Sequence, residues 1–314
     1  MPGASQGIVG LLRGIAGAGH VFAAPTGVSE LRRALMVWYR ANGRHALPWR
    51  LTRDAYAVVL SEVMLQQTQV ERVLPYYDAW LERWPTFESL AAATLAEVIE
   101  QWAGLGYNRR AVNLQRLAQA VVSQHQGRLP RDEAALRGLP GIGPYTASSV
   151  RSFAFEERTA VVDTNIGRVL ARIFAGAATA GDAGAAQIRR IATDVLPRRS
   201  VRDHNLALMD LGAVLCRARS PDCGRCPVAR SCTWQLEGQP GGARSAAPGE
   251  RFEDTARFAR GRIVDALRGG ISMSAYELGA LLPDQHRRRV EDYLGALRRD
   301  GLVEAVGDRW RLPR

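Results

Sequence analysis

The sequence LRGLPGIGPYTASSV, residues 136–150, places two glycines on either side of one apolar residue, between stretches of helical character. Glycine has no side chain, so Gly141 and Gly143 allow the backbone to turn tightly. Their amides then lie at the start of the following helix, where an anion such as a phosphate group is favoured. The pattern therefore predicts two helices joined by a tight, phosphate-binding hairpin, in preference to an ordinary connection between helices.

Helical periodicity continues on both sides of this hairpin, from about Leu31 to about Trp234. Further along the chain, three helical stretches precede LVEAVGDRWRL, which has the pattern of a hairpin with a two-residue Gly-Asp turn. The intervening EGQPGGARSAAPGE has a composition typical of linkers. The expected fold class is all-α, with a small C-terminal winged-helix-like α+β domain. The expected divisions are a disordered tail at 1–28, the main domain at 29–235, a linker at 236–253 and the winged-helix-like domain at 254–314.

The composition is strongly basic. The 314 residues carry a formal net charge of +11, and the isoelectric point is about 10.3. This balance favours a polyanionic partner, and nucleic acid is the usual one. The sequence contains no lysine, so all 42 basic residues are arginine, which excludes mechanisms that need a side-chain amine. No apolar run reaches the length of a membrane span, so we expect no membrane association.

All four cysteines lie within seventeen residues, at the spacing C-x6-C-x2-C-x5-C. Disulfides are typical of small secreted chains, whereas this chain is long enough to bury a core of its own. Zinc ribbons usually have two CxxC pairs separated by a longer loop. Four thiolates from one segment favour a [4Fe-4S] cluster held by Cys216, Cys223, Cys226 and Cys232, with zinc as the alternative. Metal-binding cysteines without a signal peptide indicate a reducing cytoplasm.

Two carboxylates are candidates for chemistry. Glu62 lies within the apolar run AVVLSEVML, where loss of solvation favours the neutral acid and raises its pKa. Such a group can act as a general acid near neutral pH, and a solvent-facing glutamate is the alternative. Asp163 follows an apolar run and precedes a helix, so we expect it to cap that helix. A capping carboxylate is fixed in place, which does not exclude a chemical role.

A set of motifs between residues 47 and 232 carries a resemblance to a known family. The motifs are LPWR (47–50), LSEVMLQQTQV (60–70), GLGYNRRAVNL (104–114), LPGIGPYT (139–146), VDTNIGRVLAR (162–172), MDLGAVLC (209–216) and the cysteine run. Together they resemble the MutY family of adenine DNA glycosylases, in the helix-hairpin-helix superfamily that includes endonuclease III. The resemblance implies a two-subdomain helix-hairpin-helix glycosylase fold with a [4Fe-4S] cluster. It also implies base excision repair of double-stranded DNA in which adenine is mispaired with 8-oxoguanine or guanine. We expect a monomeric enzyme on the nucleoid.

The resemblance also implies roles for single residues. Glu62 matches the acid that protonates N7 of the flipped adenine, and Asp163 matches the carboxylate that stabilises the oxocarbenium ion. Tyr145 and Asn165 match residues that orient this pair. The remaining matches are Trp49, Arg50, Leu65 and Leu206 in the base pocket, Gln67 and Tyr107 inserted into the base stack, and Leu139, Gly141, Gly143, Arg217, Arg219 and Arg225 on the DNA backbone.

Bifunctional relatives carry a lysine where Tyr145 stands, and they attack the sugar through a Schiff base. This chain has no lysine. The residue count and the resemblance therefore both predict a monofunctional glycosylase without strong AP lyase activity.

Other features depart from the family's pattern. MutY enzymes usually end in a Nudix-like domain that reads 8-oxoguanine, and residues 236–314 do not resemble it. Leu206 stands where glutamine or glutamate is usual, and VDTN at 162–165 resembles the form in thymine- and uracil-mismatch relatives. A thymine or uracil mismatch glycosylase is therefore the first alternative. A non-catalytic iron–sulfur DNA-binding regulator is the second, although retention of both carboxylates argues against it.

Overall fold

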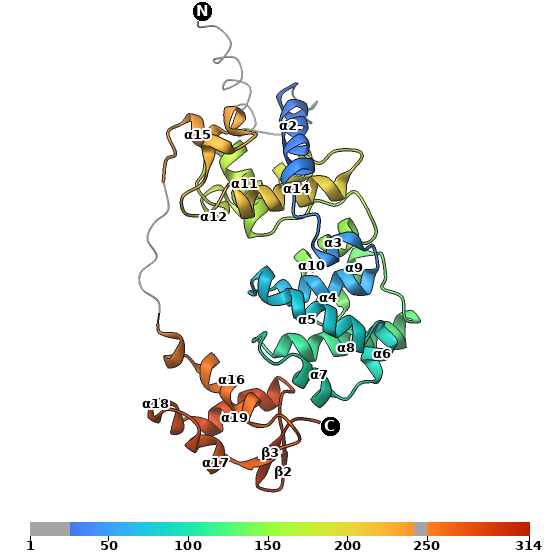
Figure 1. Cartoon of the computed structure of the whole chain (residues 1–314), viewed down its shortest axis with the longest axis vertical. Helices are drawn as coiled ribbons and strands as arrows, with labels where there is room; N and C mark the ends of the chain where they lie inside the picture. The colour runs from blue at the N-terminus through green and yellow to red at the C-terminus, as the bar shows by residue number, and fades with distance from the viewer. Residues whose placement is uncertain (1–25, 242–249) are drawn as a thin grey trace, which may run out of the picture. The chain divides into compact units, whose positions relative to one another are not determined.

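The computed structural model describes residues 26–241 and 250–314, and every element described up to residue 236 is a helix (Figure 1). The chain forms two compact units. One contains the described residues up to 53 together with 147–241, and the other contains 54–146 together with 250–314. The prediction of an all-α main part followed by a small α+β module is confirmed.

The first unit is built around α11 (Thr164–Ala175), which α12, α13, α14 and α15 all contact. Residues 166–174 of α11 are all buried. The other elements of this unit are α2 (Thr26–Asn42), α3 (Pro48–Leu51), α12 (Ala180–Ala183), α13 (Ala185–Asp194), α14 (Val201–Val214), η2 (Cys223–Arg225), η3 (Ala229–Ser231) and α15 (Thr233–Leu236), and α10 (Pro144–Phe153) begins just before it. The predicted tail extended to residue 28, but α2 already begins at Thr26. Residues 1–25 of that tail lie outside the described residues.

The second unit has α4 (Ala55–Leu65) as a buried helix that contacts α5 and α8. Its sequence is apolar on all sides, and nine of its eleven residues are buried. The other helices of this part are α5 (Val70–Arg83), α6 (Phe87–Ala92), α7 (Leu95–Gln101), α8 (Arg109–His125) and α9 (Glu133–Gly138). Local signals set their starts: α7 begins with a capping box in which Thr94 and Glu97 each accept the other's backbone amide.

The C-terminal module has the predicted winged-helix-like pattern. Its elements are η4 (Phe252–Asp254), α16 (Ala256–Ala266), β1 (Met273–Ser274), α17 (Ala275–Ala280), α18 (Asp284–Arg287), α19 (Val290–Arg299), β2 (Glu304–Val306) and β3 (Arg309–Arg311). The strands form an antiparallel sheet in the order β1-β3-β2, with Trp310 paired to Met273 and Ala305. The core of the module also includes Ile99 of α7 and Val112 of α8, both fully buried. The module therefore shares its core with these two helices.

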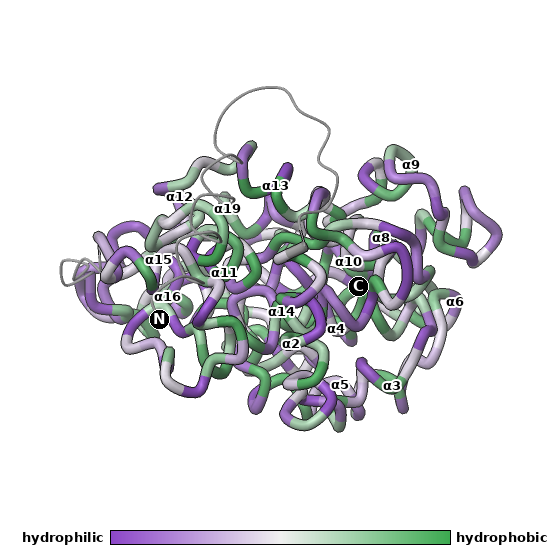
Figure 2. The backbone as a smooth tube through the Cα atoms, turned by 90° about the horizontal axis from the view of Figure 1, so that it is seen from above, coloured by the Kyte–Doolittle hydropathy of each residue, from purple (hydrophilic) through white to green (hydrophobic). Residues whose placement is uncertain are grey.

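Hydrophobic and hydrophilic residues alternate along much of the backbone (Figure 2), as expected for helices with one buried face. Among the residues that the structure describes, no helix is long and apolar enough to cross a membrane.

One buried side chain in α14 lacks a hydrogen-bond partner. His204 is 2% exposed, and neither of its ring nitrogens is hydrogen-bonded among the described residues. Burial, together with the charge of Arg32, lowers the pKa of His204 to about 4. The folded protein therefore keeps this imidazole neutral at pH values where the unfolded chain protonates it.

We expect the free energy of unfolding to decrease as the pH is lowered from about 6.5 towards about 4, because only the unfolded chain takes up a proton at His204 in this window. The full loss is roughly 3 kcal/mol. Chemical denaturation at a series of pH values should show that His204→Leu removes this part of the pH dependence. Equal slopes in the wild type and the variant would assign the acid sensitivity to other groups.

Candidate active site and cysteine cavity

Glu62 lies near the C-terminal end of α4 and is 7% exposed. Its neighbours Ser61 and Val63 are buried as well. The start of the helix is fixed by Asp54, whose carboxylate accepts the amide of Ala57 at 2.8 Å. The glutamate is therefore an interior residue of an apolar helix and does not face solvent. A carboxylic acid in such surroundings is suited to proton donation.

Asp163 caps α11, as its place in the sequence predicts. Its Oδ1 accepts the amide of Ile166 at 2.6 Å, and its Oδ2 accepts from Nδ2 of Asn165 at 3.2 Å. Burial raises the pKa of Asp163, and these hydrogen bonds limit the rise. The carboxylate is therefore held at the start of α11 with both oxygens engaged.

Arg168 extends this network towards the cysteines. Its Nη2 donates to Asn165 Oδ1 and to the carbonyl of Gly212, both at 2.8 Å, and its Nε donates to the carbonyl of Cys216 at 2.8 Å. A chain of hydrogen bonds therefore runs from Asp163 to the first cysteine. The close approach of α14 requires Gly212, because a Cβ there would lie 2.7 Å from the Cβ of Asn165.

The predicted pocket residues Trp49 and Arg50 are buried on α3. The guanidinium of Arg50 is engaged by Asp210 of α14, with Nη1–Oδ2 at 2.5 Å and Nη2–Oδ1 at 2.7 Å. Arg44 Nε also donates to Asp210 Oδ1, at 2.6 Å. Although burial opposes ionisation, these guanidiniums hold the pKa of Asp210 below its usual value. Arg50 is thus one member of a buried ion-pair network that joins α3 to α14.

The other predicted pocket residues are leucines. Leu206 is 4% exposed on α14, beside Asn205, which donates to Ser152 Oγ at 2.8 Å and to the carbonyl of Thr159 at 2.9 Å. Leu65 is half-buried at the end of α4. Leu206 and Leu65 belong to different compact units.

The two-helix hairpin predicted from the GIG sequence is formed by α9 and α10. Gly141 has a φ of +78°, and a Cβ there would lie 3.0 Å from the Cβ of Asn113, so the turn requires glycine. Leu139 is buried, and its amide donates back into α9. Gly143 and Tyr145, both half-buried, lie at the start of α10.

The two residues predicted to enter the base stack share an unusual backbone conformation. Gln67 has a φ of +59° and is exposed, and Tyr107 has a φ of +48° and is 41% exposed. Arg257 of α16 lies over the Tyr107 ring, 4.9 Å from its centroid, and donates to its hydroxyl group. The C-terminal module therefore contacts one of the two residues directly.

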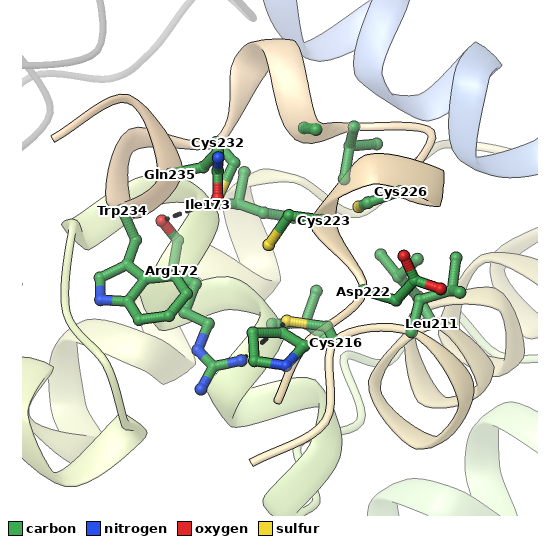
Figure 3. A pocket seen from close by; sticks show the side chains of 15 residues that line it. Arg172, Ile173, Leu211, Cys216, Asp222, Cys223, Cys226, Cys232, Trp234 and Gln235 are labelled. Atoms are coloured by element: carbon green, nitrogen blue, oxygen red, sulfur yellow. Dashed lines mark hydrogen bonds between the residues drawn. The ribbon is translucent and has the colours of Figure 1, made fainter. Parts of the chain in front are cut away.

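The four cysteines line one cavity (Figure 3). Cys216 follows α14, Cys223 and Cys226 lie at the two ends of η2, and Cys232 directly precedes α15. Most of the remaining wall is apolar, formed by Val169, Ile173, Leu211, Leu215, Val228 and Trp234. Within the described part of the chain, no three histidine, cysteine, aspartate or glutamate side chains are grouped so that they could hold a single metal ion.

Arg172 is a buried cation at the edge of this cavity. Its Nη1 donates to Cys216 Sγ at 3.4 Å, as the dashed line in Figure 3 marks, and its guanidinium lies 4.3 Å from the Trp234 ring centroid. Burial raises the pKa of Cys226 to about 12 and that of Cys232 to about 11, and the neighbouring thiols add to both shifts. Thiolates in this cavity therefore need a positively charged partner.

The three arginines expected on the DNA backbone, Arg217, Arg219 and Arg225, are all exposed. Arg225 pairs with Asp222 at 3.4 Å, and its side chain is 76% exposed.

The sequence pattern did not identify Arg168 and Arg172 as parts of the site. The available signal was RVLAR, which places two arginines four residues apart on an apolar helix. A charge in that setting requires a buried partner.

Comparisons with known proteins identify the family of this chain. Residues 60–198 match the HhH-GPD superfamily base excision DNA repair proteins. The adenine DNA glycosylase of Mycolicibacterium smegmatis is 41% identical over 278 residues, which cover 87% of this chain and 92% of that protein. The adenine DNA glycosylase of Homo sapiens is 43% identical over 223 residues, which cover 68% of this chain and 41% of that protein.

A solved structure also matches the fold. A thermostable thymine-DNA glycosylase aligns with a TM-score of 0.62 at 30% identity, covering 67% of this chain and 97% of that one. With 41% identity over most of the length of the Mycolicibacterium smegmatis protein, the chain belongs to the HhH-GPD superfamily of base excision DNA repair proteins, and within it to the adenine DNA glycosylase family.

Proposed function

We propose that the protein is a monofunctional adenine DNA glycosylase that releases adenine mispaired with 8-oxoguanine or guanine. The observation that carries the proposal is the burial of Glu62 in the apolar helix α4, at the position where the family resemblance expects the catalytic acid. Similarity to adenine DNA glycosylases over most of the chain supports the same substrate class.

Base release needs a proton on the departing base and a negative charge beside the sugar. Glu62 donates the proton to N7 of the flipped adenine, which weakens the N-glycosidic bond. Asp163, held by the Ile166 amide and the Asn165 side chain, stabilises the oxocarbenium ion that forms on the sugar. Water then adds to the sugar carbon and gives up a proton that restores the acid form of Glu62, so that the products are free adenine and an abasic site.

DNA contacts come from several surfaces. The hairpin at Gly141 and Gly143 and the exposed arginines of the cysteine loop bind backbone phosphates. Gln67 and Tyr107 enter the base stack when adenine is flipped out. The net charge of +11 supports a double-stranded DNA partner. The enzyme acts as a monomer on the nucleoid in the cytoplasm.

The cysteine cavity is proposed to hold a [4Fe-4S] cluster. Four thiols from one segment around a common, largely apolar cavity fit this group. When bound, the cluster supplies four iron–sulfur bonds that tie the loop 216–232 together. Arg172 would donate a hydrogen bond to the Cys216 sulfur, and it offsets the negative charge of the thiolates.

Protein purified without oxygen should be yellow-brown and contain about four iron atoms per chain, measured by metal analysis and visible absorption. Cys223→Ser should lower the iron content, and with it the yield of protein or its affinity for DNA. The fraction of the variant that folds should still release the base at close to the wild-type rate. Stoichiometric zinc in place of iron would overturn the cluster proposal.

Single-turnover excision on a panel of duplexes tests the proposed function. We expect release from A:8-oxoguanine and A:G duplexes, and little from A:C, T:G, U:G or hypoxanthine duplexes. Faster release from T:G or U:G would favour the thymine and uracil alternative. Tight binding without release from any duplex would favour a regulator. Borohydride should trap no substantial enzyme–DNA adduct, because the chain has no lysine to form a Schiff base.

A further inference from the structure

Arg110 is a buried cation, 8% exposed, in the first turn of α8. Its two terminal nitrogens reach oxygen atoms in two separate segments of the chain. Nη1 lies near the carbonyls of Val63 (2.9 Å), Met64 (2.9 Å) and Gln66 (2.6 Å), and Nη2 near Thr68 Oγ1 (3.1 Å) and the carbonyls of Leu105 (3.1 Å) and Gly106 (3.0 Å). One guanidinium therefore connects segment 63–68 to segment 105–106.

Each connected segment lies beside a residue with a left-handed backbone. Gln67 lies between two of the oxygen-bearing residues, and Tyr107 directly follows Gly106; their φ values are +59° and +48°. Non-glycine residues rarely adopt this conformation, and it persists only where the surrounding structure enforces it. Arg110 is therefore placed to hold both backbones in this form.

The same side chain completes the end of the helix that carries Glu62. The last carbonyls of a helix have no partner within the helix, and a cation is favourable beside them. Arg110 supplies that partner to Val63 and Met64 in the last turn of α4. The guanidinium also lies 5.1 Å from the ring centroid of Trp102, whose Nε1 donates to the Gly106 carbonyl at 3.0 Å.

We propose that Arg110 is a positioning residue for base flipping, which sets the spacing between Gln67, Tyr107 and the end of the helix that carries Glu62. The proposal rests on the proposed function, because it assigns Gln67 and Tyr107 to the base stack. This positioning role requires the planar guanidinium group, whose two terminal nitrogens point towards different segments. Lysine has the charge but only one nitrogen, so it cannot reach both segments in the same way.

Arg110→Lys in the full-length, cluster-containing protein tests the proposal. The probe is a duplex with 2-aminopurine beside an adenine opposite 8-oxoguanine. The fluorescence rise and single-turnover base release should both slow by on the order of 10- to 100-fold at saturating enzyme, while affinity for an undamaged duplex changes little. Arg109→Lys is the matched control, because Arg109 is exposed and pairs at 3.5 Å with Asp300. It should behave as the wild type.

A double-mutant cycle separates positioning from general support of the fold. In a Tyr107→Ala background, Arg110→Lys should cause less further loss than in the wild type, because one of the residues whose position it sets is gone. The proposal would be overturned if the losses of excision rate in the two single variants added fully in the double variant. It would also be overturned if the loss in Arg110→Lys only matched a decrease in the fraction of folded protein. If Arg110→Lys fails to fold, Thr68→Val is tested in its place. Thr68→Val removes one oxygen near Nη2 of Arg110, so it should slow the fluorescence rise and base release by a smaller factor.

Hydrogen exchange of the DNA-free protein provides a readout that does not depend on the excised base. In Arg110→Lys, amides at 66–68 and 105–107 should exchange faster together, and those elsewhere should be unchanged. Unchanged exchange in both segments refutes the positioning role even if adenine excision is confirmed. Faster exchange in both, with no excision of adenine by the wild type, refutes the proposed function and leaves the connection between the segments intact.

Discussion

Glu62→Gln should bind duplex DNA as the wild type does and release adenine about 10²- to 10⁴-fold more slowly. The amide has nearly the size of the carboxylic acid but has no acidic proton for the departing base. The residue is buried on α4, so water cannot easily substitute for it. Single-turnover release from an A:8-oxoguanine duplex measures the rate, and electrophoretic mobility shift or anisotropy measures binding.

The matched control for this variant is Glu71→Gln. Glu71 is exposed in the first turn of α5, in the same compact unit. This variant makes the same replacement of a carboxyl group by an amide, but at the protein surface, and it should release adenine at the wild-type rate. Release by Glu62→Gln at a rate close to that of the control would mean that another residue is the acid.

Asp210→Asn should lower the free energy of unfolding by about 3–5 kcal/mol. Asp210 is completely buried and accepts hydrogen bonds from the side chains of Arg50 and Arg44. The amide removes the negative charge and leaves the buried guanidinium of Arg50 uncompensated. Chemical denaturation followed by far-UV circular dichroism measures the loss.

Glu156→Gln is the control for this prediction, because it breaks an ion pair of similar length at the surface. Arg53 and Glu156 are 2.7 Å apart, with side chains 47% and 58% exposed. Exposed pairs contribute about 0–1 kcal/mol, so this variant should remain close to the wild type. Equal losses in the two variants would show that burial does not set the strength of the Asp210 network.

The C-terminal module illustrates where prediction from sequence was partial. Three helical stretches and the hairpin around Gly307 were evident from periodicity and turn chemistry. The structure contains them, except that the third stretch is divided into α18 and α19. The core that the module shares with Ile99 and Val112 was not evident from the sequence. An apolar residue on a helix indicates burial, but not which segment covers it.

The sequence by itself determined the helical architecture, the hairpin at Gly141, the capping of α11 by Asp163 and the apolar character of the helix that carries Glu62, whereas the burial of Glu62 itself came from the structure. These features depend on local spacing, on turn residues and on the apolar character of α4, which neighbouring residues reveal. It also placed four cysteines close enough along the chain to surround one cavity.

Only the tertiary structure decided the partners of the buried arginines. Arg50 pairs with Asp210 across 160 positions, and Arg110 reaches carbonyl groups 46 and 47 positions away. Backbone carbonyl groups occur at every residue, so no side-chain pattern shows which of them a guanidinium will meet. Packing of helices that are distant in the sequence brings these groups together, and the cost of leaving a buried charge unpaired makes the resulting contacts specific.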